Sequence, residues 1–172
     1  RVFIAIVSVI VLLGLFIFMS ASLGLLARSG VDFGTATLKQ IFAGVGVGLV
    51  ALIVGARIPY RFWKKAAVPI FLISIGLMIL VLFPQIGISA NGARRWLPLG
   101  PFSVQPAEFL KFGFVIYLAS WISSLKTDIR SLKSGLLPFL VILGVVAFLL
   151  LKQPDTGTFM IFFFTALAMF VV

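Results

Sequence analysis

The feature that most limits the fold is a run of 26 residues without a charge, from Val2 to Ala27. About 20 apolar residues in a helix are enough to cross the hydrocarbon core of a bilayer. Further apolar runs follow at 41–56, 66–83, 108–124, 135–151 and 159–172. With 62% hydrophobic and 10% charged residues, the chain is far from the composition of a soluble domain. We therefore predict an all-α polytopic integral membrane protein, a helical transmembrane bundle whose single domain, 1–172, holds about five and a half spans.

The charged residues exclude several kinds of function. The formal net charge is +10, but the basic residues are scattered through short segments between apolar runs, as membrane orientation and headgroup contacts require. We therefore expect the lipid bilayer, and not nucleic acid, to be the partner of this charge. The chain has no cysteine and no histidine, which removes disulfides, thiol nucleophiles and zinc sites of the usual kind. Any catalysis must use carboxylates, Lys, Arg, hydroxyl groups or a hard cation held by oxygen.

The same residues predict the orientation of the chain. We expect outer loops at 28–40, 84–107 and 152–158, and cytoplasmic loops at 57–65 and 125–134. The cytoplasmic side, with Arg1, then holds eight of the fourteen basic residues, and three of the other six lie in the polar stretch described next. Because positively charged loops stay in the cytoplasm, the amino terminus is predicted to be cytoplasmic.

The polar stretch from Asn91 to Lys111 is the long break in this apolar sequence, and we expect it to contain the functional site. Glu108 and Lys111 are three residues apart at a helix start, so they share a face, and Pro106 suits the entry to that helix. Ionisable residues within membrane spans are candidates for function. Two interpretations stay open: an exposed ion pair of little energetic value, or a pair that faces a polar cavity and binds an anionic group.

Two arginines and a tryptophan lie side by side in the same stretch, at Arg94, Arg95 and Trp96. A guanidinium presents parallel N–H donors that match two oxygens of a phosphate, so this group favours a phosphate ligand. Anchoring to lipid headgroups is the alternative. Asn91 and Gly92 are typical of a tight turn that would present the arginines.

A second polar segment contains Asp155, at the mouth of the last apolar run. An aspartate directly before a helix most often caps it, and a role as catalytic base is the alternative. Nothing in the sequence fixes the separation of Asp155 and Glu108, so they do not by themselves define a glycosidase-like pair. Elsewhere, Gly44 and Gly48 stand four apart in an apolar run and predict close helix packing.

Residues 91–111 read N-G-A-R-R-W-L-P-L-G-P-F-S-V-Q-P-A-E-F-L-K, and residues 153–158 read Q-P-D-T-G-T. Together with the weaker Ser20-Ala21-Ser22, they resemble the motifs of the SEDS family (shape, elongation, division and sporulation), which includes RodA, FtsW and SpoVE. The three matches occur in the right order over nearly all of the chain. Their details lean towards the FtsW and SpoVE branch.

The resemblance implies a bundle of about ten spans, of which this chain carries the first five and part of a sixth. It implies a peptidoglycan glycosyltransferase of the bacterial cytoplasmic membrane, which polymerises lipid II (an undecaprenyl-linked disaccharide-pentapeptide) into glycan strands and releases undecaprenyl diphosphate. The partner would be a class B penicillin-binding protein, a transpeptidase. The family's catalytic aspartate would lie beyond Val172, so we expect the chain alone to be inactive. No cofactor is implied, although a divalent cation stays open.

Carried over residue by residue, the resemblance places a substrate cavity in the two polar segments. Arg95 would contact the lipid-linked diphosphate, with Lys111 near it and Glu108 balancing the local charge. The other candidate substrate-binding residues are Arg94, Asn91, Gln105, Asp155 and Thr158. The residues expected to hold the structure of the motifs are Gly92, Trp96, Pro106, Gln153, Pro154 and Gly157. Two other functions stay open: a flippase for a lipid-linked precursor, or a non-enzymatic scaffold that recruits a transpeptidase.

Overall fold

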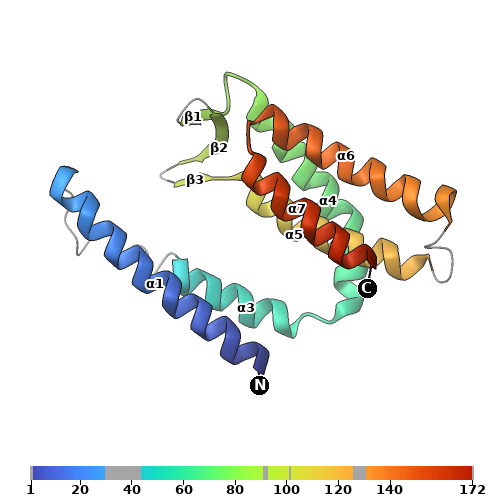
Figure 1. The fold of residues 1–172 in the computed structure, drawn as a ribbon, viewed down its shortest axis with the longest axis horizontal. Helices are drawn as coiled ribbons and strands as arrows, with labels where there is room; N and C mark the ends of the chain where they lie inside the picture. The colour runs from blue at the N-terminus through green and yellow to red at the C-terminus, as the bar shows by residue number, and fades with distance from the viewer. Residues whose placement is uncertain (1, 30–43, 91–92, 101, 126–130, 172) are drawn as a thin grey trace. The chain divides into compact units, whose positions relative to one another are not determined.

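The computed structural model describes residues 2–29, 44–90, 93–100, 102–125 and 131–171 (Figure 1). It contains two compact units, Arg1–Pro59 and Tyr60–Val172. The described residues of the first unit form two apolar helices, α1 (Val2–Ser29) and α3 (Val47–Arg57), and a π-helical turn at 44–46 precedes α3. Most described side chains of α1 are apolar and exposed. A helix that is apolar on every side needs hydrocarbon or other protein around it.

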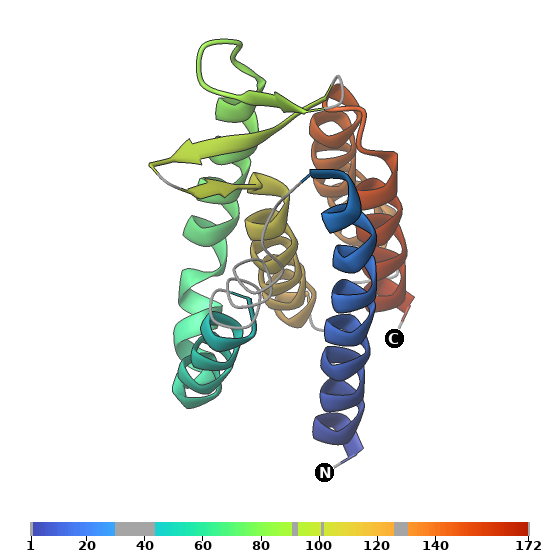
Figure 2. The ribbon, with the colours of Figure 1, turned by 90° about the vertical axis from the view of Figure 1, so that its left-hand side faces the viewer.

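In the second unit, the described residues form four α-helices (Figure 2). They are α4 (Tyr60–Leu82), α5 (Pro106–Ser124), α6 (Leu137–Lys152) and α7 (Thr156–Val171), with a π-helical turn, Leu132–Leu136, leading into α6. Helix α5 packs against α4 and α7, and α7 also packs against α6. Phe114 of α5 is buried in the core, with its ring centroid 5.1 Å from that of Phe162 on α7 and 6.3 Å from that of Phe71 on α4. Aromatic contacts of this kind add to the stabilisation by apolar burial.

Helices α4 and α5 lie in close contact at Gly113. A Cβ atom placed on Gly113 would lie 2.8 Å from the hydroxyl oxygen of Ser74 and 3.3 Å from Cγ2 of Ile70. The Ser74 hydroxyl donates to the Ile70 carbonyl oxygen at 2.8 Å, so its oxygen is held in this position. By contrast, a Cβ atom at Gly48 would meet nothing within 4 Å among the described residues. The absence of a side chain at Gly113 therefore permits this contact between α4 and α5.

Between α4 and α5 the chain forms a small antiparallel sheet at one end of the helices (Figure 2). Its strands are β1 (Ile88–Ala90), β2 (Ala93–Leu99) and β3 (Phe102–Val104), in the order β1-β2-β3. Leu99 pairs with Phe102, so two residues separate β2 from β3. The first of them, Gly100, has a φ of +64°, a conformation that glycine adopts without steric cost and that two-residue hairpins need.

The helices extend beyond the predicted apolar runs at several ends. The segment 57–65 is predicted to be a loop, whereas α4 begins at Tyr60 and includes Arg61, Lys64 and Lys65 in its first turns. The segment 84–107 is predicted to be a loop, whereas it contains the sheet and the start of α5. Hydropathy marks the part of a helix that sits in hydrocarbon, and it gives no signal for polar first turns or for short strands.

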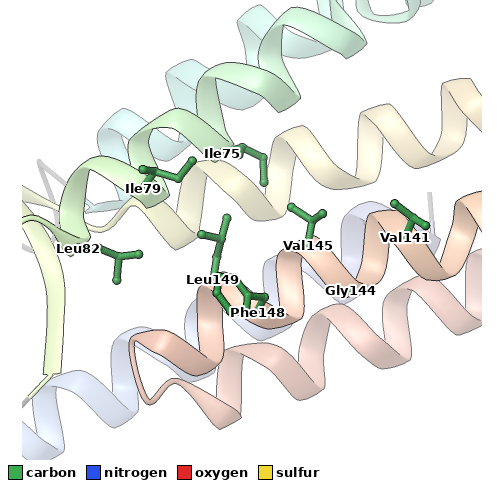
Figure 3. Close-up of a pocket in the computed structure, with 8 residues that line it drawn as sticks. All are labelled: Ile75, Ile79, Leu82, Val141, Gly144, Val145, Phe148 and Leu149. Carbon is green, nitrogen blue, oxygen red and sulfur yellow. The ribbon is translucent and has the colours of Figure 1, made fainter.

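Three helices in the described part of the chain are long and apolar enough to cross a membrane: Ile4–Ala21, Tyr60–Leu82 and Leu132–Lys152. Gly44–Arg57 and Thr156–Val171 are shorter apolar helices. An apolar groove of about 620 Å³ runs between α4 and α6, with Ile75 and Ile79 on one wall and Val145 and Phe148 on the other (Figure 3). Such a surface is compatible with contact to lipid chains or to other helices.

Candidate functional site

The two polar segments of the sequence meet in the structure at Arg95. Its Nε donates a hydrogen bond to the carbonyl oxygen of Gln153 at 3.2 Å, and its Nη2 donates to the carbonyl oxygen of Pro154. Its Nη1 lies 3.8 Å from Oδ1 of Asp155. The guanidinium, whose side chain is 32% exposed, therefore joins strand β2 to the connection between α6 and α7.

A β-bulge accompanies this contact. Ser89 pairs with Arg94 and Ile88 pairs with Trp96, so Arg95 is the extra residue on β2. A bulge interrupts the regular alternation of side chains along a strand and gives the extra residue a new direction. Arg94 stays exposed while Arg95 is partly buried against the connection. The two adjacent arginines thus have different surroundings, which their sequence does not reveal.

Asp155 caps α7. Its Oδ1 accepts a hydrogen bond from the backbone N–H of Thr158 at 3.3 Å, three residues further on, as a helix-capping aspartate does. The cap predicted from the sequence is confirmed. The Asp155 side chain is 8% exposed, and its Oδ2 is buried with no hydrogen-bond partner among the described residues. Because a buried carboxylate oxygen without a donor is costly, Asp155 depends on the nearby guanidinium.

Gln153 fixes the other side of the connection. Its side chain is 2% exposed, and its Nε2 donates to the carbonyl oxygen of Met78 on α4 at 3.4 Å. The connection is therefore held from the sheet by Arg95 and from α4 by Gln153. The sequence does not predict a role for Met78, because the acceptor is a backbone carbonyl and any residue type could supply it.

Glu108 and Lys111 form an ion pair on the first turns of α5. Lys111 Nζ lies 2.8 Å from Oε2 of Glu108, and their side chains are 35% and 58% exposed. The prediction that they share a helix face is confirmed. Lys111 also lines a small, mostly apolar cavity of about 180 Å³ between α5 and α7, together with Phe162 and Thr165. Among the described residues, no hydrogen bond or ion pair joins this pair to Arg95 or Asp155.

The remaining predicted site residues surround these two groups. Gln105 precedes α5 as its capping residue, although its side chain makes no capping hydrogen bond, and Pro106 is in the first turn as predicted. Trp96 on β2 and Gly157 in the first turn of α7 are exposed. Asn91 and Gly92 lie outside the described residues. In the part of the chain that the structure describes, no group of three or more His, Cys, Asp or Glu side chains could hold a metal ion.

The charges of this end of the second unit are largely balanced in pairs. Arg95 faces Asp155, and Lys111 faces Glu108. Arg94 and Lys152 are exposed in addition, and Lys152 Nζ lies 5.6 Å from the ring centroid of Phe148. The described residues therefore leave an excess of positive charge here, which suits an anionic ligand.

The family described as "Cell cycle protein", FtsW/RodA/SpoVE, matches residues 1–172. A protein of Trichlorobacter lovleyi, named "Probable peptidoglycan glycosyltransferase FtsW", is 40% identical over 144 residues, which cover 84% of this chain and 38% of that protein. A protein of Coxiella burnetii with the same name is 35% identical over 158 residues, which cover 91% of this chain and 42% of that protein.

Two solved structures have a similar fold. The rod shape determining protein RodA of Thermus thermophilus is 30% identical, with a TM-score of 0.64 over 87% of this chain and 49% of that chain. A structure described as "Structural coordination of polymerization and crosslinking by a peptidoglycan synthase complex" is 28% identical, with a TM-score of 0.69 over 90% of this chain and 45% of that chain. The chain thus spans less than half the length of these relatives. The likenesses confirm the predicted polytopic helical fold.

Proposed function

The chain belongs to the FtsW/RodA/SpoVE family of cell cycle proteins, and we propose that the protein containing it is a peptidoglycan glycosyltransferase of a bacterial membrane. It polymerises lipid II into glycan strands, during cell division or septal and cell-wall synthesis, and releases undecaprenyl diphosphate. The names of the relatives support the glycosyltransferase activity. The description of a structural neighbour as a peptidoglycan synthase complex supports polymerisation.

The observation that carries this proposal for the chain's own residues is the contact of Arg95 with the 153–155 connection. The two polar segments lie far apart in the sequence, and Arg95 brings them into one place through two hydrogen bonds and an ion pair. Both segments carry the sequence motifs that resemble the family. A site assembled from both motifs is what a shared role in substrate binding requires.

Within this site we assign different tasks to the two arginines. A guanidinium has five N–H donors, and Arg95 uses two of them on backbone carbonyls. Arg95 therefore holds the connection in place and keeps other donors for the lipid-linked diphosphate. Arg94 is exposed beside it and can present its whole fork to a phosphate. Asn91 and Gln105 complete the proposed binding residues on this side.

The other proposed binding residues are on α5 and α7. Lys111 supplies a second positive charge, and Glu108 holds it by the 2.8 Å ion pair. Asp155 and Thr158 fix the start of α7 through the cap, and the carboxylate of Asp155 lies beside the Arg95 guanidinium. We assign no catalytic residue within these 172 residues, and we propose that the catalytic aspartate lies outside them.

The proposed partner is a class B penicillin-binding protein, which crosslinks the strands that this protein makes. The neighbour described as a complex that coordinates polymerization and crosslinking supports such a pairing. The proposed location is the cytoplasmic membrane, with the amino terminus in the cytoplasm. The positive charge of Arg61, Lys64 and Lys65 at the start of α4 supports this orientation. The site around Arg95 then faces outwards.

The test is lipid II polymerisation by the full-length protein purified with its transpeptidase. Wild type is compared with Arg95→Ala and Glu108→Gln, and with Lys133→Gln, an exposed lysine at the opposite end of α6, as the control. We expect glycan strands from wild type and from the control, and a loss of at least tenfold in the two site variants, which corresponds to about 1.4 kcal/mol of barrier. Folding is checked by size-exclusion chromatography.

Undiminished strands in Arg95→Ala and Glu108→Gln would contradict the assignment of the site and leave the polar stretch as an anchor. An absence of strands from every folded complex would contradict the enzyme itself. That outcome would favour the transporter hypothesis, which vesicles loaded with a labelled lipid-linked precursor can examine directly.

A further inference from the structure

A second polar feature lies at the opposite end of the helices from Arg95. Lys64, in the second turn of α4, donates a hydrogen bond from Nζ to the hydroxyl oxygen of Ser123 on α5 at 3.2 Å. Ser123 is also part of the lining of a groove of about 440 Å³ between α5 and α7. The rest of this lining is apolar, with Ala119 and Ile122 on α5 and Ala168 and Met169 on α7.

The groove thus combines an apolar floor with a cation at its edge. Two further basic residues lie near Lys64: Arg61, three residues before it, and Lys65, one residue after it. All three side chains are exposed. Residues at this spacing lie on neighbouring positions of one side of a helix. The cluster therefore carries three positive charges within two turns of α4.

No described carboxylate neutralises this cluster. The described acidic residues are Glu108, in the first turn of α5, and Asp155, the cap of α7. Both lie at the other ends of their helices, and the 15 residues from Glu108 to Ser123 correspond to about 22 Å along α5. Within the described residues the cluster therefore has an excess of positive charge, which suits an anionic ligand.

Aromatic residues mark the level of the membrane interface at the same place. Tyr60 and Trp63 lie in the first turn of α4, beside Arg61 and Lys64. Tryptophan and tyrosine gather at the headgroup level of bilayers. The cationic cluster is then at headgroup depth, and the groove runs from that depth along α5 and α7 towards the hydrocarbon.

We propose that this groove binds one anionic phospholipid of the cytoplasmic leaflet. Its phosphate lies against Lys64, with Arg61 and Lys65 beside it, and the Ser123 hydroxyl donates to a headgroup oxygen. One acyl chain lies in the apolar part of the groove between α5 and α7. Anionic lipids and basic pockets between membrane helices on the cytoplasmic side are complementary in this way. The site is separate from the proposed glycosyltransferase site and does not depend on that activity.

The test is native mass spectrometry of the full-length protein in detergent, titrated with phosphatidylglycerol or with phosphatidylcholine of the same acyl chains. Wild type is expected to retain phosphatidylglycerol preferentially. Because each basic residue near an anionic surface contributes about 1 kcal/mol, Lys64→Gln should weaken this preference about fivefold, and Arg61→Gln/Lys64→Gln/Lys65→Gln roughly a hundredfold. Lys133→Gln, which removes one exposed charge outside the lining of the groove, is the control and should match wild type.

A groove-filling variant separates a lipid site from simple attraction to charge. Ala168→Phe keeps all three cations and puts a bulky side chain in the path of the acyl chain, so it should also lose retained phosphatidylglycerol. Wild-type retention in Ala168→Phe would overturn the proposal, and so would equal retention of the two lipids by wild type. A loss in Lys133→Gln as large as in Lys64→Gln would overturn it too. The comparison of phosphatidylglycerol with phosphatidylcholine uses the wild-type protein alone, so it tests the proposal even where a variant fails to fold.

Discussion

Replacing Arg95 by alanine should destabilise the protein chiefly through lost hydrogen bonds and only secondarily through a lost ion pair. A hydrogen bond from a charged donor contributes about 1.5–3 kcal/mol, and Arg95 makes two such bonds to the carbonyls of Gln153 and Pro154. Because the side chain is 32% exposed, water competes for these donors, and the lower end of the range applies to each bond. The two hydrogen bonds together then contribute about 3 kcal/mol. The 3.8 Å pair with Asp155 is long and partly solvated, and it adds about 1 kcal/mol.

Asp155→Asn separates the two contributions. Asparagine caps a helix about as well as aspartate, so the hydrogen bond to the Thr158 N–H is kept while the charge is lost. We expect Asp155→Asn to lower the free energy of unfolding by about 1 kcal/mol and Arg95→Ala by about 4 kcal/mol. Asp155→Ala, which also loses the cap, should cost about 1 kcal/mol more than Asp155→Asn.

The assay is denaturant unfolding of the full-length protein in detergent micelles, followed by tryptophan fluorescence, with Lys133→Gln as a control of unchanged stability. The ranking of the variants by their free energy of unfolding tests this reasoning more sharply than the value for any one variant. If Asp155→Asn were as costly as Arg95→Ala, the ion pair and not the carbonyl contacts would hold the connection. If Arg95→Ala unfolded within about 0.5 kcal/mol of wild type, the contact would have no structural value at all.

Two further predictions concern α5. Gly113→Ala should destabilise the full-length protein by about 1–3 kcal/mol, because its Cβ would lie 2.8 Å from the Ser74 hydroxyl oxygen. Adding Ser74→Ala should restore much of the loss in the same unfolding assay, while Gly76→Ala, which meets nothing within 4 Å, should not destabilise. Glu108→Gln should change the free energy of unfolding by less than about 1 kcal/mol, since its ion pair with Lys111 is exposed, although strand synthesis falls. A large unfolding defect in Glu108→Gln would mean that the pair has a structural role instead.

The parts of this structure that could be predicted from the sequence are the local ones. A long uncharged run predicts α1 because the bilayer fixes the length of a span. The cap by Asp155 and the pair of Glu108 with Lys111 join residues three apart, and helix geometry alone brings such residues together. Pro106 is at the entry of α5 because proline lacks an N–H that the first turn does not need.

The sheet could not be predicted in the same way. Strand β2 reads Ala-Arg-Arg-Trp-Leu-Pro-Leu, in which two arginines are adjacent and a proline interrupts the apolar half, so no alternation of period two is visible. The bulge at Arg95 is the physical reason for that irregularity, because an extra residue shifts the pattern by one position. A pattern that a bulge has shifted looks like a loop when it is compared with an ideal strand.

The contact of Arg95 with the connection between α6 and α7 could not be predicted from residue types either. Arg95 binds the backbone carbonyls of Gln153 and Pro154, and a carbonyl is present at every position of the chain, so residue type gives no indication of the partner. The sequence can say that an arginine is there and that a polar segment lies beyond α6. Only the bulge gives Arg95 a direction that Arg94 does not share, and only the capped start of α7 brings the three polar groups of 153–155 to one guanidinium. The two arginines are therefore not interchangeable, since Arg95 uses two of its donors on the protein itself and keeps only the others for a ligand, whereas exposed Arg94 can present its whole fork.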